Sequence, residues 1–332
     1  MSADRLPTAA FGTSPRVGWL KLAGRYDVYL ILILFAVVAS LLSRDFLSVG
    51  NLGNLLSQSA LLGLLSVAQF LVVIAGGFDL SVAGVMALSS LVLARTIGYG
   101  LGPAAILAVL AGVAAGLFNG LVIAKGRVQP LIATLATMGV ARGLALSISE
   151  KSILVNDPTI AMLRNLDGPF SVPTIVWFAV VVLALLWFGL TKQAVHVYAI
   201  GGNETTAQLA GVDLVRIKVG VYTTSGLIAG VTGVVLVVRS SSGVPLGGMG
   251  WELDTIAAIV IGGTNLFGGE GKLFRAMAGV LIYQMIANVM NLTSVDPYYQ
   301  QIVRAAVIVL AVGLSIFRQR RSSRRVVQGR AE

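Results

Sequence analysis

Few side chains in this sequence could carry out chemistry, and they do not form the groupings that catalysis needs. The chain has no cysteine and a single histidine, His196, so a thiol nucleophile and a histidine metal cluster are both excluded. No nucleophile stands beside a general base in a catalytic motif, and there is no Walker-type phosphate-binding loop. The sequence therefore predicts a chain that is not an enzyme and holds no cofactor of its own.

Two glycine pairs beside polar residues are the most conspicuous motifs. One reads Gly76-Gly77-Phe78-Asp79-Leu80-Ser81, the other Gly262-Gly263-Thr264-Asn265-Leu266, and each follows a long apolar run. Aligned from their first glycines, they share Gly-Gly-x-(Asp/Asn)-Leu. Glycine permits positive φ and close backbone approach, so each pair predicts a break between two half-helices. Both motifs fall at the same end of their runs, which suggests a parallel repeat.

The elements that carry these motifs are apolar. Of 332 residues, 56% are hydrophobic and 11% are charged, and the mean hydropathy is +0.89. Soluble domains carry about 25% charged residues, and disordered chains have low hydrophobicity, so both classes are excluded. At about 20 residues per span, about ten spans account for the apolar share. We therefore predict an all-α, polytopic helical membrane protein with about ten transmembrane spans.

The apolar runs place these spans along most of the chain. The eighth is short and ends in glycines, which favours a broken or re-entrant segment. The predicted spans are 26–42, 57–75, 80–97, 103–124, 131–148, 172–190, 218–238, 255–266, 273–292 and 300–317.

The positions of the basic residues predict the orientation. The formal net charge is +10, and most Lys and Arg fall in the tails and in alternate short loops, which fits the positive-inside rule better than nucleic-acid binding. We expect both termini to be cytoplasmic, with an N-terminal segment over 1–25, a transmembrane domain over 26–317 and a basic tail over 318–332. The tail is either a solvated stop-transfer segment or a contact for anionic membrane lipid.

Some polar residues lie within or beside spans, where they are costly unless paired or facing water. Arg142 either has an internal partner, such as a carboxylate or backbone carbonyls, or contacts a solute. Asp79 and Asn265 either cap helix breaks or line the path, and Asn119 either bonds across helices or lines it. The candidates for a translocation path or a helix break are Gly76, Gly77, Asp79, Ser81, Asn119, Arg142, Gly262, Gly263 and Asn265.

Other glycines recur at spacings of four residues, on single helix faces. This spacing lets helix backbones approach closely, either within one subunit or across a dimer. The glycines are Gly112, Gly116 and Gly120, then Gly139 and Gly143, and Gly226 and Gly230.

The longest predicted cytoplasmic loop, 191–218, has the features of a docking element. Asn203 can cap a short helix, and Gly211 can end it in the left-handed conformation. A short helix outside the bilayer with small and apolar residues suits a partner's groove, although a solvated connector has the same composition. The candidate docking residues are Asn203, Thr205, Thr206, Ala207, Leu209 and Gly211.

Several motifs together resemble the ribose-type permeases, the membrane subunits of ATP-binding-cassette importers for monosaccharides. The segment 76–82 is similar to their GGxDLSV signature, 198–212 to their cytoplasmic coupling loop, and 252–269 to their ELDAIAAVVIGGTSLFGG segment. The segment 130–143 resembles their fifth span. Thr205, Thr206 and Ala207 stand where the family commonly has Glu-Ala-Ala.

The resemblance implies a permease subunit in the bacterial cytoplasmic membrane, paired with a second permease subunit as a homodimer or heterodimer. A separate ATPase would bind ATP and Mg and dock on the coupling loop, and an extracytoplasmic binding protein would deliver the solute. The solute would be a monosaccharide or related polyol; a nucleoside or small signalling molecule is the alternative. A stand-alone channel or secondary carrier fits less well, because no chain of acidic residues crosses the membrane.

Overall fold

The computed structural model describes residues 15–166 and 171–328, and helices dominate it. The helices are α1 (Pro15–Leu42), α2 (Val49–Ile74), α3 (Val82–Thr96), the 3-10 turn η1 (Ile97–Tyr99), α4 (Leu101–Ala124), α5 (Pro130–Ile148), α6 (Pro158–Arg164), α7 (Val172–Leu190), α8 (Lys192–Gly202), α9 (Glu204–Leu209), α10 (Leu214–Ser240), α11 (Trp251–Ile261), α12 (Leu273–Leu292) and α13 (Pro297–Gln328). Two short strands, β1 (Ile153–Leu154) and β2 (Ser242–Gly243), pair antiparallel.

Seven helices of the described chain are long and apolar enough to cross a membrane, so the polytopic helical class is confirmed. They are α2, α3 with η1, α4, α5, α7, α10 and α12. The apolar part of α1, Tyr26–Leu42, is shorter. A helix stands at every predicted span, but the number of crossings stays a prediction.

Several predicted boundaries were wrong, and α2, for example, begins at Val49 rather than at Ser57. The eighth span was expected to reach Leu266, but α11 has 11 residues and ends at Ile261, because the chain turns at Gly262 and Gly263. The segment 191–218 was expected to be a loop with one short helix. It holds two helices, and α10 begins at Leu214, where the Asp213 side chain accepts a hydrogen bond from the Arg216 backbone amide.

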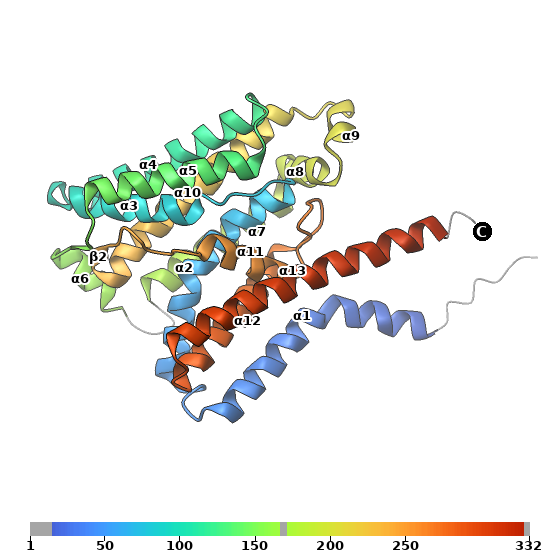
Figure 1. The fold of residues 1–332 in the computed structure, drawn as a ribbon, viewed down its shortest axis with the longest axis horizontal. Helices are drawn as coiled ribbons and strands as arrows, with labels where there is room; N and C mark the ends of the chain where they lie inside the picture. Colours follow the sequence, from blue (N-terminus) through green and yellow to red (C-terminus); the bar gives the residue numbers. More distant parts are fainter. Residues whose placement is uncertain (1–14, 167–170, 329–332) are drawn as a thin grey trace, which may run out of the picture.

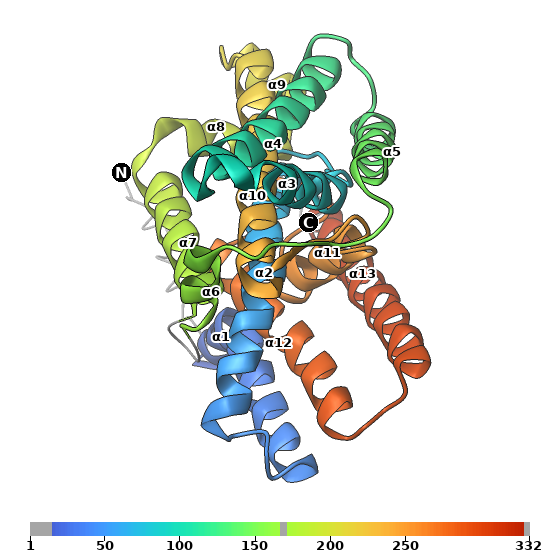
Figure 2. The same ribbon diagram turned by 90° about the vertical axis from the view of Figure 1, so that its left-hand side faces the viewer.

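Helix α2 is the central element, and α7, α10, α11 and α12 surround it (Figures 1 and 2). Nearly every residue from Ser59 to Ile74 is fully buried, which explains why this helix is apolar on all sides. Both glycine motifs that the sequence singles out lie in segments next to this core.

The glycine faces divide into two kinds. Gly112 and Gly116 of α4 pack against Gly226 and Gly230 of α10, and a methyl group added to Gly112 would lie 2.8 Å from the Gly230 Cα. These glycines therefore serve close packing within one subunit. Gly139 and Gly143 of α5, in contrast, face open space in this chain.

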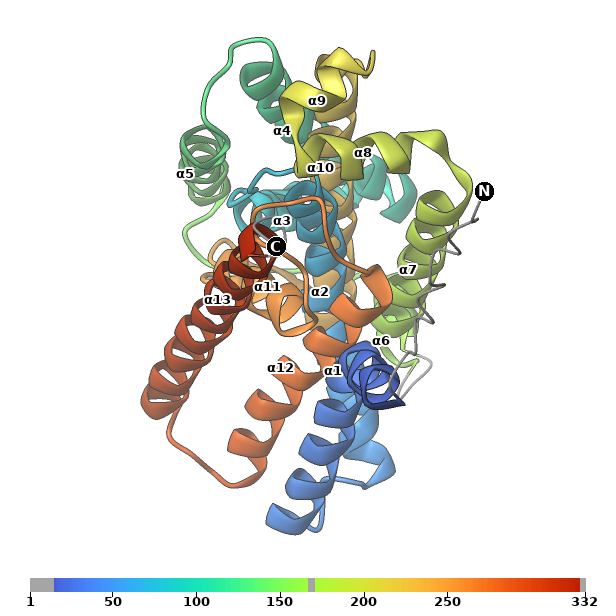
Figure 3. The same ribbon diagram turned by 90° about the vertical axis from the view of Figure 1, so that its right-hand side faces the viewer.

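The molecule has two distinct ends along its long axis. Helices α8 and α9 lie at the same end as the C-terminal part of α13, whereas α6 and β2 lie at the other (Figure 1). Figure 3 shows α8 and α9 beside the first turns of α10. This arrangement supports placing the docking segment and the C-terminus on one side, although their cytoplasmic location stays a prediction.

Candidate functional site

The first glycine motif ends α2 in a Schellman motif. Gly76 has φ +80°, and its amide donates to the Val73 carbonyl at 2.9 Å. The Gly77 amide donates to the Val72 carbonyl at 3.0 Å. These two bonds satisfy carbonyls that the helix end would otherwise leave unpaired, and only glycine takes the positive φ without strain.

The second motif ends α11 by the same pattern. Gly263 has φ +86°, and its amide donates to Val260 at 2.8 Å, while the Thr264 amide donates to Ile259 at 3.0 Å. Gly262, in contrast, keeps a helical φ of −65°. It lacks a side chain because α12 passes close by: a methyl there would lie 2.5 Å from the Ala276 Cα.

The two motifs are therefore offset by one residue in structure. The left-handed glycine is the first of the pair at Gly76 but the second at Gly263. Gly76 thus corresponds to Gly263, and the alignment that paired Gly76 with Gly262 was wrong by one position. Each pair contains one glycine that adopts positive φ and one that leaves space for a neighbouring segment. The positive-φ glycine comes first in the first pair and second in the second pair.

The polar residues after the first motif form a closed network. One oxygen of Asp79 accepts from the amide and hydroxyl of Ser81, and the other accepts from the Ser225 hydroxyl of α10 at 2.7 Å. Asn119 of α4 donates to Ser81 at 2.9 Å and accepts from Thr137 of α5. All five side chains are buried. The network joins the α2–α3 break to three further helices.

Three predicted path candidates, Asp79, Ser81 and Asn119, thus meet in space. They lie inside the protein, where Asp79 is only 1% exposed. The geometry is that of helix capping and cross-helix bonding; a role in a solute path stays a prediction. Sequence reasoning missed Ser225 and Thr137, although each is a polar residue within a predicted span.

Three glycine pairs meet at one junction between the break and the docking segment. The Gly269 amide donates to the Ile74 carbonyl at the end of α2, at 3.0 Å. A side chain on Gly201 of α8 would collide with that carbonyl, and one on Gly268 would lie 2.8 Å from the Gly76 Cα. We name this backbone contact, formed by 74–77, 201–202 and 268–269, the glycine junction.

A tyrosine closes the glycine junction from α8. The Tyr198 hydroxyl donates to the Gly271 carbonyl at 2.8 Å. Burial raises the pKa of the Tyr198 phenol, so the hydroxyl keeps its donor proton at neutral pH. Helix α8 is therefore bonded to the segment between α11 and α12, as well as packed on the end of α2.

Helix α9 presents the predicted docking residues. The Asn203 side chain accepts from the Thr206 amide at 2.9 Å, and Gly211 has φ +84° after the helix end. Thr205 and Thr206 are exposed, and Leu209 is 85% exposed. Ala207 alone points inward and is buried. A short capped helix with an exposed leucine stands free for a partner; docking itself stays a prediction.

Arg142 has internal partners. Its guanidinium donates to the carbonyls of Pro245 at 3.1 Å and Gly247 at 2.9 Å, in the segment between β2 and α11. Backbone carbonyls are one of the partners that the sequence left open for it. The contact holds α5 to the segment that leads into α11.

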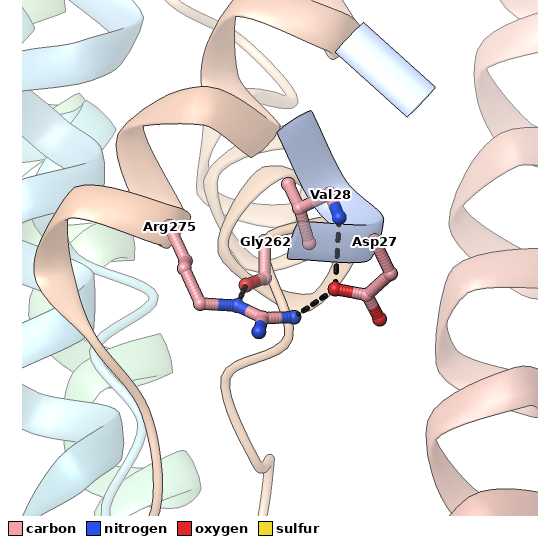
Figure 4. Close-up of polar contacts among 4 residues, drawn as sticks. All are labelled: Asp27, Val28, Gly262 and Arg275. Atoms are coloured by element: carbon pink, nitrogen blue, oxygen red, sulfur yellow. Dashed lines mark hydrogen bonds and ion pairs between the residues drawn. The ribbon is translucent and has the colours of Figure 1, made fainter. Parts of the chain in front are cut away.

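The second break is fixed by a charged clamp. Asn265 accepts from the Phe267 amide at 3.1 Å and so caps the turn. Arg275, in the first turn of α12, donates to the Gly262 carbonyl at 3.3 Å and pairs with Asp27 of α1 at 2.6 Å (Figure 4). One side chain thereby joins the end of α11, α12 and α1.

Taken together, the apolar helices, the two helix breaks and the exposed helix α9 define a polytopic helical membrane protein. The family described as "Branched-chain amino acid transport system / permease component" matches residues 51–312. The ribose import permease of Escherichia coli K12 is 39% identical over 290 residues, covering 85% of this chain and 90% of that protein. No solved structure matches the chain.

Two further relatives extend the comparison. The ribose import permease of Bacillus subtilis 168 is 38% identical over 292 residues, covering 86% of this chain and 90% of its own length. The L-arabinose transport system permease of E. coli K12 is 36% identical over 309 residues, covering 89% and 92%. The chain belongs to this family of transport-system permease components. The resemblance that its motifs suggested is confirmed.

Proposed function

We propose that this chain is the membrane subunit of an ATP-binding-cassette importer for a monosaccharide or related polyol. The relatives named for ribose and L-arabinose support a sugar as the solute. The observation that carries the mechanism is the glycine junction, because it joins α8 to both helix breaks through backbone contacts.

The mechanism follows from that connection. A partner ATPase, holding ATP and Mg, docks on α9 and shifts α8 with it. Three closely packed backbones leave little room to deform, so the shift passes to the end of α2 and to the 268–271 segment. The breaks then move α3 and α11 relative to α2. An extracytoplasmic binding protein supplies the solute, and a second permease subunit completes the path in the bacterial cytoplasmic membrane.

The docking step has a direct experiment. Leu209→Asp puts a charge on the most exposed part of α9 and should reduce co-purification of the ATPase at least tenfold in mild detergent, and uptake with it. Leu154→Asp is the matched control, since Leu154 is 76% exposed in β1, which pairs with β2 at the other end of the molecule. Full ATPase recovery with Leu209→Asp would contradict the docking assignment.

The Arg142→Ala variant distinguishes a structural role of this residue from a role in the solute path. Because Arg142 bonds to two carbonyls, we expect Arg142→Ala to lower the apparent Tm in detergent and to reduce uptake only in proportion to the folded protein remaining. A variant with unchanged Tm, membrane level and ATPase docking but no uptake would instead place Arg142 in the solute path.

The cargo and the energy source are tested together in liposomes. Uptake that needs ATP, the ATPase and the binding protein, with a pentose or hexose as substrate, is the expected result. Competition by nucleosides but not sugars would favour the alternative cargo. Uptake by this chain alone without ATP would favour the channel or carrier interpretation.

A further inference from the structure

An apolar groove of about 840 Å³ opens between α7, α8 and α10, and Leu71 of the central helix lies in it. Its walls along α10 run from Asp213 to Ile228. At about 1.5 Å per residue, this face is about 22 Å long, comparable with one leaflet of a bilayer that is about 40–45 Å thick including its head groups.

The groove is divided into an apolar part and a polar mouth. The apolar part contains Val180 and Leu183 of α7 with Val221, Leu227 and Ile228 of α10. Apart from Thr224 on α10, the polar and charged side chains gather at the α8 end, and they are Gln193, His196, Asp213 and Arg216. An occupant must therefore be long and apolar with one polar end.

The apolar part lies between two membrane spans. Both α7 and α10 are long and apolar enough to cross the bilayer, and Leu183 and Leu227 remain 65% and 42% exposed. Trp187 lies in the groove near the end of α7, and tryptophan is enriched at the level of lipid head groups. The groove therefore opens toward lipid, with its mouth at the membrane surface.

The mouth carries a cation that forms no ion pair within the described part of the chain. The guanidinium of Arg216 is exposed, and the described residues give it no ion pair. The nearby Asp213 carboxylate is engaged in capping α10, where it accepts from the Arg216 amide at 3.0 Å. A guanidinium matches a phosphate by paired hydrogen bonds, and His196, which lines the same groove, supplies a further donor.

We propose that this groove binds one membrane phospholipid, with its phosphate between Arg216 and His196 and its acyl chains along α7 and α10. The site joins α8, which carries part of the glycine junction, to two spans. Bound lipid therefore contacts both α8 of the docking segment and the membrane-spanning helices α7 and α10.

Native mass spectrometry of the purified full chain tests the site by counting retained phospholipids. Gly220→Leu fills the groove, because Gly220 lines it and a side chain there meets no other atom within 4 Å. Gly189→Leu is the matched control: Gly189 lies on α7, also has open space around it, and is not among the lining residues. Arg216→Glu and the exposed Lys125→Glu form a second pair with equal charge changes.

We expect wild type and both controls to retain one phospholipid more per chain than Gly220→Leu and Arg216→Glu, at unchanged apparent Tm. Equal lipid counts in all five proteins would overturn the site. A detergent-stable dimer that Gly220→Leu dissociates, with no change in lipid count, would assign the groove to a second copy of this chain and would also overturn it.

A second measurement locates the lipid. Brominated phosphatidylglycerol, added to delipidated protein, should saturably quench tryptophan fluorescence, and Trp187→Phe should remove most of the saturable part. Brominated phosphatidylcholine should bind at least threefold more weakly if Arg216 recognises net negative charge, and Arg216→Glu should remove that difference. Quenching that is linear in lipid, and unaffected by Trp187→Phe, would contradict a discrete site.

Discussion

The two helix breaks end their helices identically but lie in opposite surroundings. After Gly76 the chain enters a buried network in which Asp79 and Ser81 bond to α4 and α10. After Gly263 the chain runs through a partly exposed turn, capped by Asn265 and returning toward α8. One break is fixed by the core around it, and the other by local bonds and a charged clamp.

The comparison shows that a glycine pair can serve two separate purposes. One member takes the left-handed conformation, while the other leaves room for a neighbour. At the first break the neighbour is the Tyr222 side chain next to Gly77, and at the second it is the α12 backbone next to Gly262. Backbone yields less readily than a side chain, so the two space-giving glycines should differ in their tolerance of substitution.

The largest effect is expected at Gly262. In Gly262→Ala the new methyl would meet the α12 backbone 2.5 Å away, and we expect a loss of about 3 kcal/mol in stability. Gly263→Ala adds left-handed strain of about 1 kcal/mol, and its new methyl would lie no closer than 3.1 Å to any neighbouring atom, the nearest being in the Arg275 side chain. Unfolding midpoints in SDS titrations, measured on purified protein, compare the two.

The order of these variants ranks the two roles within the second glycine pair. If Gly263→Ala were the more damaging, the left-handed turn would contribute more to stability than the close contact with α12, and the predicted order would be wrong. Gly139→Ala on α5 serves as the control for glycine loss itself, because open space surrounds it, and it should be neutral or slightly stabilising.

A second prediction concerns Gly77, whose added methyl would collide with the Tyr222 hydroxyl. We expect Gly77→Ala to cost about 2 kcal/mol, since an overpacked site must shift its neighbours. Tyr222→Phe removes the colliding oxygen and loses only a 3.3 Å hydrogen bond to the Phe78 carbonyl. The double variant should therefore be more stable than Gly77→Ala alone, as a double-mutant cycle would measure. Strictly additive losses would contradict this contact.

The sequence predicted the helical class and the sites of both breaks, because apolar runs and glycine pairs are local signals. It did not predict α8, although Thr191, whose side chain accepts from the Ala194 amide, is a suitable cap. Nor did it predict the glycine junction. Gly201 and Gly268 meet the end of α2 only after distant segments have packed, and no local pattern encodes that contact.

The third prediction compares the two polar residues of the breaks. Asp79→Ala leaves buried hydroxyls of Ser81 and Ser225 without their acceptor, and we expect a loss of about 2 to 3 kcal/mol. Asn265→Ala removes one bond at a partly exposed turn and should cost about 1 kcal/mol. Asp79→Asn keeps one acceptor oxygen and should fall between them. Equal midpoints for Asp79→Ala and Asn265→Ala would mean that the network adds nothing beyond capping.

The smallest effect should come from the clamp at the second break. Asp27 and Arg275 are 32% and 19% exposed, so water screens their ion pair, and Asp27→Asn should cost only about 0.5 kcal/mol. The effect should shrink further in high salt, whereas the losses at Asp79 should not, because a buried neutral hydroxyl partner carries no charge for ions to screen. Salt-dependent unfolding of the two variants therefore separates a break held by surface charge from one held by the core. If the stability loss of Asp27→Asn did not change with salt, the Asp27–Arg275 ion pair would behave like the buried network and not like a surface charge pair.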